Sequence, residues 1–122
     1  MSNWKIKSEI TETIINISLF DDLNQQKGLM RLEIYFSNLP WQNVNSYMLS
    51  TESNKGIPRA LLTEATKQLK KYALIRKTTL VHNVSFQTSV SREKLPKLFE
   101  EFNYTLVEQQ NTTYPQYVKV YQ

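Results

Sequence analysis

Few residues in this sequence belong to the types that carry out catalytic chemistry. It contains no cysteine, which excludes thiolate nucleophiles, disulfides and cysteine-ligated zinc. His82 is its one histidine, so a Ser/His/Asp nucleophile arrangement cannot be argued from the sequence. With one histidine and no cysteine the sequence also offers few ligands for a transition metal, and we expect no metal. His82 is interpreted either as a structural histidine or as a catalytic base. The P-loop pattern of nucleotide-binding proteins is absent.

Glu33 is the candidate catalytic carboxylate. It alternates with Leu32 and Ile34, so its side chain is expected on the opposite face of a strand. If that face lines an acceptor cleft, Glu33 can act as a general base through a water molecule. The alternative is an exposed carboxylate on a strand.

A glycine–proline turn opens the strongest predicted helix. Gly56 precedes Ile57 and Pro58, and proline suits a first helical turn because its missing N–H would be unpaired there. A helix N-terminus offers N–H donors to an anion, and a glycine permits close approach of a pyrophosphate. Pro58 removes one of these donors. In the alternative interpretation Gly56 only precedes the helix.

Basic residues gather towards the end of the same helix. One account is a solvated face whose cations are favoured by the helix dipole. The other is an anion site for a phosphorylated cofactor or a nucleic acid. The net charge of +4 does not separate the two. The residues are Lys67, Lys70, Lys71, Arg76 and Lys77.

Hydrophobic periodicity predicts the elements that position these residues. A strand that follows an amphipathic helix indicates a βαβ crossover and a partly parallel sheet. We expect one or two strands within 4–20, a polar loop at 21–28, strands at 32–36 and 47–49, a helix over 57–73, a strand over 78–86, a helix from about 95 that Asn103 ends, and strands at 104–109 and 116–121.

The chain length and composition fit one domain. A chain of 122 residues has room for a single core, and 40% hydrophobic residues suffice to build it. The N-terminal residues lead into no apolar run of signal-peptide length, and no segment is apolar over the length of a membrane span. We therefore expect one α/β domain over 1–122 in a soluble, cytoplasmic protein.

Three segments resemble motifs of the GNAT acetyltransferase family, and their order and spacing agree from about residue 46 to 121. The segment Asn54-Lys55-Gly56-Ile57-Pro58-Arg59-Ala60-Leu61-Leu62 resembles the acyl-CoA turn, Q/R-x-x-G-x-G/A. The segment Leu98-Phe99-Glu100-Glu101-Phe102-Asn103-Tyr104 resembles the L-Y-x-x-x-G-F segment, where a helix gives way to a strand. The ending Tyr117-Val118-Lys119-Val120-Tyr121 is similar to the last strand of the family.

The resemblance implies a fold, a cofactor and an activity. The fold would be a mixed, mostly antiparallel sheet, splayed in the middle and covered by helices, in the order β-β-(β)-α-β-α-β-β. The cofactor would be acetyl-CoA or another acyl-CoA, and the acceptor an amine. The residues implied to bind the cofactor are Asn54, Lys55, Gly56, Ile57, Arg59 and Ala60.

The sequence departs from the family pattern at chemically important positions. Pro58 replaces a Gly or Ala, Ser53 a Gln or Arg, and Asn103 a Gly. Phe99 replaces a tyrosine whose hydroxyl protonates the departing thiolate, and phenylalanine has no proton to give. Only strands are predicted before the turn, where family members usually carry one or two helices that wall the acceptor site. The acceptor side is therefore expected to be missing, rebuilt by the 38–55 loop or supplied by another subunit.

Two functions therefore stay open. One is an N-acetyltransferase with a degenerate active site. The other is a non-catalytic interaction protein, or a nucleic-acid binder, on the same scaffold. Without helical cover the N-terminal strands should expose apolar surface, which predicts a homodimer or a partner protein. Candidates for that surface are Trp4, Phe20, Phe36 and Trp41.

Overall fold

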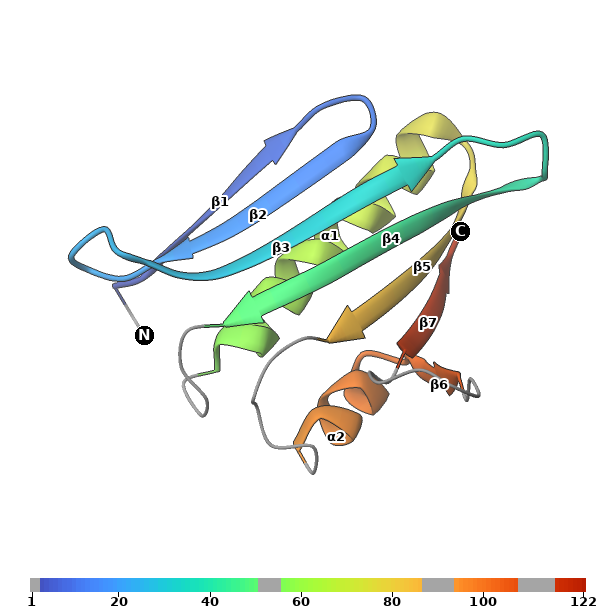
Figure 1. Cartoon of the computed structure of the whole chain (residues 1–122). Coiled ribbons are helices and arrows are strands. Elements are labelled where there is room, and N and C mark those ends of the chain that lie inside the picture. The colour runs from blue at the N-terminus through green and yellow to red at the C-terminus, as the bar shows by residue number, and fades with distance from the viewer. Residues whose placement is uncertain (1–2, 51–55, 87–93, 108–115) are drawn as a thin grey trace.

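A computed structural model describes residues 3–50, 56–86, 94–107 and 116–122. In these ranges four strands precede the first helix (Figure 1). The sequence pattern predicts three or four, because it leaves open whether one or two strands lie within 4–20. The elements are β1 (Lys5–Ile10), β2 (Ile14–Phe20), β3 (Gln26–Tyr35), β4 (Trp41–Ser50), α1 (Ile57–Arg76), β5 (Thr79–Phe86), α2 (Lys94–Glu101), β6 (Thr105–Val107) and β7 (Gln116–Tyr121).

The described strands form one sheet in the order β1-β2-β3-β4-β5-β7-β6. Only β4 and β5 are parallel, and α1 provides the crossover between them, as the sequence predicts. All other neighbours are antiparallel. The fold is therefore the predicted mixed, mostly antiparallel α/β arrangement.

The core lies between the sheet and α1, which runs behind the strands in Figure 1. Ile15, Ile17 and Leu19 of β2 alternate with partly exposed residues, so their side chains line one face. On α1 the apolar residues recur at helical spacing and face the sheet. The buried helix residues are Ile57, Pro58, Leu61, Leu62, Ala65, Leu69, Tyr72 and Ala73.

Gly28 lies inside β3, although the sequence pattern places it in the polar loop. A Cβ at this position would lie 2.5 Å from Ile57 Cγ2 and 3.1 Å from Leu61 Cδ1. The missing side chain thus lets the first turn of α1 pack directly on β3. This contact holds the N-terminus of α1 against the sheet.

Several predicted boundaries change in the structure. The segment from Trp4 to Ile10 contributes a separate strand, β1, paired with β2. The short strand expected at 47–49 is the ten-residue β4, and the helix expected at 57–73 continues one turn further to Arg76. Trp4 packs partly buried against the core, so it does not belong to an exposed apolar surface.

The C-terminal part follows the predicted pattern closely. Helix α2 begins at Lys94, which places Pro96 in its first turn. Asn103 adopts the left-handed conformation (φ 65°) expected at a helix end. Strands β6 and β7 then pair as the predicted closing hairpin. The turn between these two strands lies outside the described residues.

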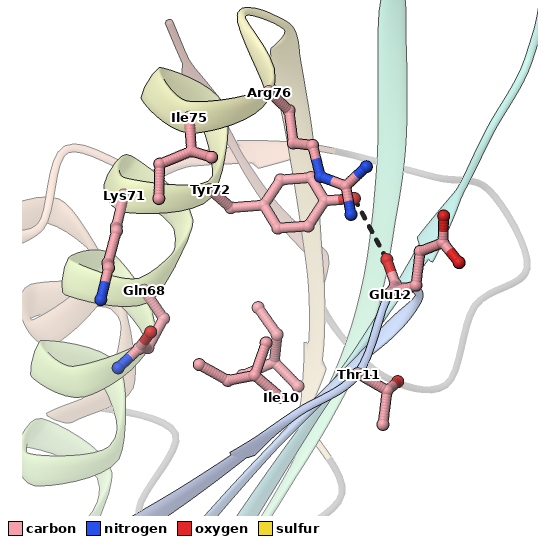
Figure 2. Close-up of a pocket in the computed structure, with 9 residues that line it drawn as sticks. Ile10, Thr11, Glu12, Gln68, Lys71, Tyr72, Ile75 and Arg76 are labelled. Carbon is pink, nitrogen blue, oxygen red and sulfur yellow. Dashed lines mark hydrogen bonds between the residues drawn. The ribbon is translucent and has the colours of Figure 1, made fainter.

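The far end of α1 is fastened to the turn between β1 and β2 (Figure 2). The Tyr72 hydroxyl donates a hydrogen bond to the Glu12 carbonyl oxygen over 3.2 Å. The helix is thus fixed to the sheet at both ends, by Gly28 at its start and by Tyr72 near its end. No helix in the described part of the chain is long and apolar enough to cross a membrane.

Candidate cofactor and acceptor site

The N-terminus of α1 presents backbone donors. Gly56 caps the helix with φ 70°, a left-handed conformation that glycine adopts without steric cost. The Ala60 N–H bonds to the Gly56 carbonyl at 3.1 Å, and Pro58 has no N–H. Among the described residues no side chain caps the helix, so there the N–H groups of Ile57 and Arg59 remain as donors for an anion.

Arg59 extends from this first turn to the end of α2. Its Nη1 lies 2.6 Å from a Glu101 carboxylate oxygen, and both side chains are more than half exposed. The hydrogen bond from Arg59 lowers the pKa of Glu101, and the same contact raises the pKa of Arg59. The guanidinium beside the helix N-terminus is therefore already paired with a carboxylate.

A polar hollow of about 350 Å³ lies where β4, β5 and β7 adjoin. Asn45 and Asn83 are register partners on the two parallel strands, and Asn45 faces away from the core because Val44 and Ser46 on either side of it are buried. Amide groups can orient a polar ligand through hydrogen bonds. The hollow is lined by Asn45, Ser46, Asn83, Val84 and Gln116.

A chain of buried polar side chains starts at Ser46, a residue of the hollow. The Ser46 hydroxyl lies 2.7 Å from His82 Nε2, and His82 Nδ1 lies 2.6 Å from the Tyr104 hydroxyl. Tyr104 in turn lies 2.7 Å from the Tyr121 hydroxyl, which reaches Thr66 on α1 at 3.4 Å. All buried polar side-chain atoms of the described residues have such a partner.

This environment keeps His82 uncharged. Its side chain is fully buried, and burial, together with the charge of Lys119, lowers its pKa to about 3. Burial and the neighbouring Tyr121 raise the pKa of Tyr104 above that of a free tyrosine. A neutral imidazole has one N–H, so one ring nitrogen donates and the other accepts. This geometry favours the structural interpretation of His82 over the catalytic base.

The comparisons with known proteins concern the fold. No protein-family model matches the sequence, and no curated protein is similar to it. A solved structure of spermidine/spermine N-acetyltransferase SpeG from Vibrio cholerae is similar to this chain with a TM-score of 0.60 and 14% identity. The match covers 98% of this chain and 92% of that one. The solved structure of an acetyltransferase of the GNAT family from Streptococcus pneumoniae is similar to this chain with a TM-score of 0.56 and 11% identity. The match covers 90% of this chain and 67% of that one.

The chain has the GNAT fold. A domain from Methanocaldococcus jannaschii has similar structure as well, with a TM-score of 0.59, 17% identity, and 90% of this chain and 68% of that one covered. At these identities the likeness concerns the arrangement of helices and strands. The predicted family resemblance is confirmed at this level.

The GNAT-fold turn at the start of α1 is only partly described. Asn54 and Lys55, and also Ser53, lie outside the described residues. The Ile57 side chain is fully buried, so Ile57 faces the turn through its backbone N–H. Ala60 packs against the core, and its N–H is bonded to the Gly56 carbonyl. Gly56 and Arg59 are the predicted cofactor residues with exposed positions at the turn.

The expected splay between the central strands does not occur along their paired length. Strands β4 and β5 are in continuous register from Trp41–Thr79 to Met48–Phe86. An acyl group entering between them therefore has to lie beyond Met48 or displace part of the ladder. A polar hollow opens on the sheet beside Asn45 and Asn83.

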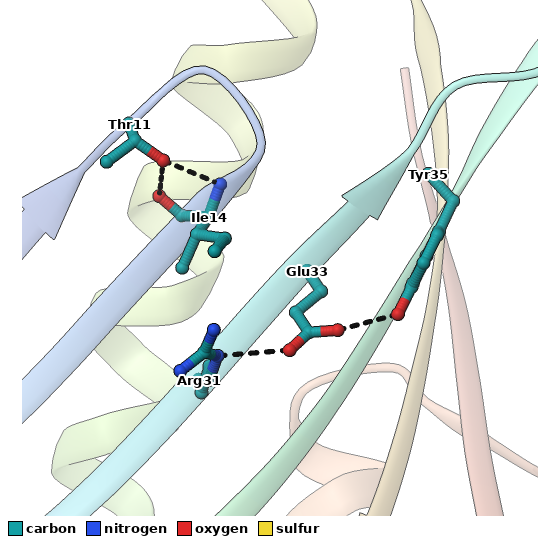
Figure 3. Close-up of polar contacts among 5 residues, drawn as sticks. All are labelled: Thr11, Ile14, Arg31, Glu33 and Tyr35. Atoms are coloured by element: carbon teal, nitrogen blue, oxygen red, sulfur yellow. Dashed lines mark hydrogen bonds and ion pairs between the residues drawn. The ribbon is translucent and has the colours of Figure 1, made fainter.

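Glu33 points to the face of the sheet opposite the core, as its alternation predicts (Figure 3). It accepts hydrogen bonds from the Tyr35 hydroxyl at 2.6 Å and from Arg31 Nε at 3.0 Å. The Tyr35 hydrogen bond, followed by the Arg31 charge, lowers the pKa of Glu33. Its register partner on β4 is Asn45, so Glu33 stands one strand away from the hollow.

Phe99, which stands where the family has a tyrosine, is a core residue. It is fully buried and stacks on the Tyr117 ring at a centroid distance of 4.3 Å. Tyr104 meets it edge-on at 5.5 Å. Sequence reasoning missed the polar role of Tyr104 and Tyr121. The available signal was the three tyrosines at 104, 117 and 121, close to the C-terminal strands.

No group of three or more His, Cys, Asp or Glu side chains in the described ranges is arranged to hold a metal ion.

Proposed function

We propose that this protein binds acetyl-CoA or another acyl-CoA and transfers the acyl group to an amine. The observation that supports this most is the left-handed Gly56 cap, which leaves the Ile57 and Arg59 amides open at the N-terminus of α1 in a GNAT fold. Helix N-termini of this kind bind phosphate groups through their N–H donors and dipole. In this proposal the pyrophosphate lies at Gly56 to Ala60, with Asn54 and Lys55 beside it.

The amine would enter from the face of the sheet that carries the polar hollow. There Asn45 and Asn83 offer amide groups, and the carboxylate of Glu33 lies one strand away. Because its pKa is lowered, Glu33 is anionic at neutral pH and attracts a protonated amine. It also remains the candidate for a general base that acts through water.

The transfer itself needs little covalent participation by the protein. The amine nitrogen attacks the thioester carbonyl, the C–S bond breaks, and the nitrogen loses a proton. Positioning of the two reactants supplies most of the acceleration. Since Phe99 cannot donate a proton to the departing CoA thiolate, we expect the transfer to be slow.

The uninterrupted pairing of β4 with β5 supports a second candidate function. A GNAT-fold protein without space between these strands can bind partners and yet transfer nothing. It would be a non-catalytic interaction protein. A measurement of acyl transfer distinguishes the two candidates, because only the acyltransferase would form an acylated product.

Release of the free CoA thiol in the presence of amines tests the proposal. Polyamines are the first acceptors to try, because a similar structure is that of a spermidine/spermine N-acetyltransferase. We expect slow thiol release together with an acetylated product detected by mass spectrometry. Gly56→Val should abolish it, because a β-branched side chain is strained at φ 70° and blocks the turn. Acetyl-CoA binding without any acetylated product would favour the non-catalytic function.

We further propose that the protein forms a homodimer. Apolar and aromatic side chains cluster at the connection between β3 and β4, where Tyr35, Phe36, Leu39 and Trp41 are all between 37% and 54% exposed. Contiguous apolar surface of this kind usually marks a contact site. A second copy would bury it.

A further inference from the structure

A groove of about 420 Å³ lies at the other end of α1, between the helix and the turn that joins β1 to β2. Figure 2 shows Ile10 and Ile75 on opposite sides of it. These two side chains are 52% and 66% exposed, so the folded chain leaves much of their apolar surface in water. A ligand that covers them would gain the free energy of that burial.

The walls of the groove are already in place. Tyr72 is 8% exposed, and its hydroxyl is held by the Glu12 carbonyl. Ile15, which is 1% exposed, closes the bottom, and it pairs with Ile10 across the β1–β2 hairpin. A ligand entering here needs no rearrangement of the backbone. Preformed apolar sites of several hundred cubic ångströms are typical of small-molecule binding.

The rim of the groove is positively charged. The Arg76 guanidinium lies 5.5 Å from the centroid of the Tyr72 ring, and Lys71 lines the same groove. Within the described ranges neither cation forms an ion pair. The one acidic residue of the lining is Glu12, whose side chain points away from Ile10 in Figure 2.

The helix dipole accounts for only one of these cations. Arg76 stands in the last turn of α1, where a positive charge stabilises the helix. The effect is confined to the last turn, and Lys71 precedes it. Lys71 thus places a second cation, outside the last turn, beside the exposed apolar surface of the groove.

We propose that this groove binds an amphipathic carboxylate, a ligand with an apolar chain or ring and one anionic end. The apolar part lies against Ile10, Tyr72 and Ile75, and the carboxylate is paired with Lys71 and Arg76. Arg76 can offer two parallel N–H donors to a carboxylate. The site lies at the opposite end of α1 from Gly56, so it is independent of the proposed acyl-CoA site.

A titration with decanoate below its micelle concentration, followed by ¹H–¹⁵N NMR, tests the proposal. We expect amide shifts confined to residues 10–12 and 68–76, with a dissociation constant on the order of 100 µM. Decylamine, which has the same chain and the opposite charge, should bind at least about tenfold more weakly. The neutral variants Lys71→Gln and Arg76→Gln should each weaken decanoate binding about three- to tenfold.

Lys67→Gln is the matched control, since Lys67 is exposed on α1 but does not line the groove. It should leave decanoate affinity unchanged. Equal losses for Lys67→Gln and Lys71→Gln would overturn the proposal, because they would indicate non-specific attraction to a basic helix. Absence of shifts at millimolar decanoate would overturn it as well. So would shifts at the same residues on raising the protein concentration alone, which would identify a second copy of the chain as the occupant.

Discussion

Arg59 is paired with one anion, the Glu101 carboxylate, and would meet a second if a pyrophosphate binds as proposed. It stands in the first turn of α1, beside the open amides that a phosphate would use, and it is paired with Glu101 of α2. The pair joins the two helices at the candidate cofactor site. A bound pyrophosphate would have to take the guanidinium from Glu101 or share it.

The variant Glu101→Gln should therefore bind acetyl-CoA more tightly. An exposed ion pair of this kind is weak, so the expected gain in affinity is about two- to fivefold. Calorimetric titration of both proteins measures it. Glu100→Gln is the matched control, because Glu100 is the exposed neighbour on the same helix and, among the described residues, Arg59 forms its ion pair with Glu101. Equal affinities for wild type and Glu101→Gln would mean that Arg59 takes no part in binding.

His82 makes stability depend on pH in a defined window. Its pKa is about 3 in the folded chain and about 6.5 when unfolded, so the unfolded state binds a proton that the folded state does not. Stability is therefore complete above pH 6.5 and falls as the pH decreases, by about 1.4 kcal/mol per pH unit. Urea unfolding between pH 7.5 and 4.5 measures the slope. As His82 is the one histidine of the sequence, a flat profile above pH 5 would show that it is not buried as described.

At the scale of the elements, the start of α1 is positioned by β3. Gly28 permits an approach that any side chain would obstruct, and the atom it would meet first is Ile57 Cγ2. The open amides of the candidate cofactor site belong to the same helical turn. Packing in the core thus fixes the direction in which these donors point.

Gly28→Ala should destabilise the protein by about 1–3 kcal/mol, the usual effect of overpacking a core. Thermal or urea unfolding measures the change. In the double variant with Ile57→Ala the clash is removed, so the combined loss should be smaller than the sum of the single losses. Strict additivity would mean that Gly28 and Ile57 do not contact each other.

Local patterns predict the elements of this fold well where apolar residues alternate cleanly, as in β2 and α1. They underestimate β4 because Ser46 stands at a core-facing position and breaks the alternation. That serine is tolerated in the core because it bonds to His82, which is 36 positions away in the sequence. A contact of such long range leaves no trace in the local pattern.

The same limit applies to the candidate site. Gly56 and the start of α1 are predicted from the sequence because a glycine–proline turn before an amphipathic stripe is a local signal. The Arg59–Glu101 pair joins residues 42 positions apart, and it becomes visible only once α2 is placed beside α1. The hollow at Asn45 and Asn83 likewise depends on the register of two strands separated by a helix.

At the scale of the whole molecule, the sheet exposes aromatic surface at the β3–β4 connection. Trp41→Ala should weaken the proposed homodimer about tenfold or more, as expected for an aromatic residue at the centre of an interface. Sedimentation velocity over a wide concentration range measures it, and circular dichroism verifies that α1 stays folded. A wild-type protein that is monomeric at all concentrations would exclude the dimer.

The central claim is that the N-terminus of α1 binds the pyrophosphate of an acyl-CoA. A titration with acetyl-CoA, read by calorimetry and by amide NMR on the same sample, tests it most directly. We predict weak but saturable binding, with a dissociation constant on the order of 100 µM, since Pro58 removes one donor. The shifts should centre on residues 56–62 and be absent in Gly56→Val. Acetyl-CoA at millimolar concentration that gives neither heat nor shifts at these amides would contradict the account.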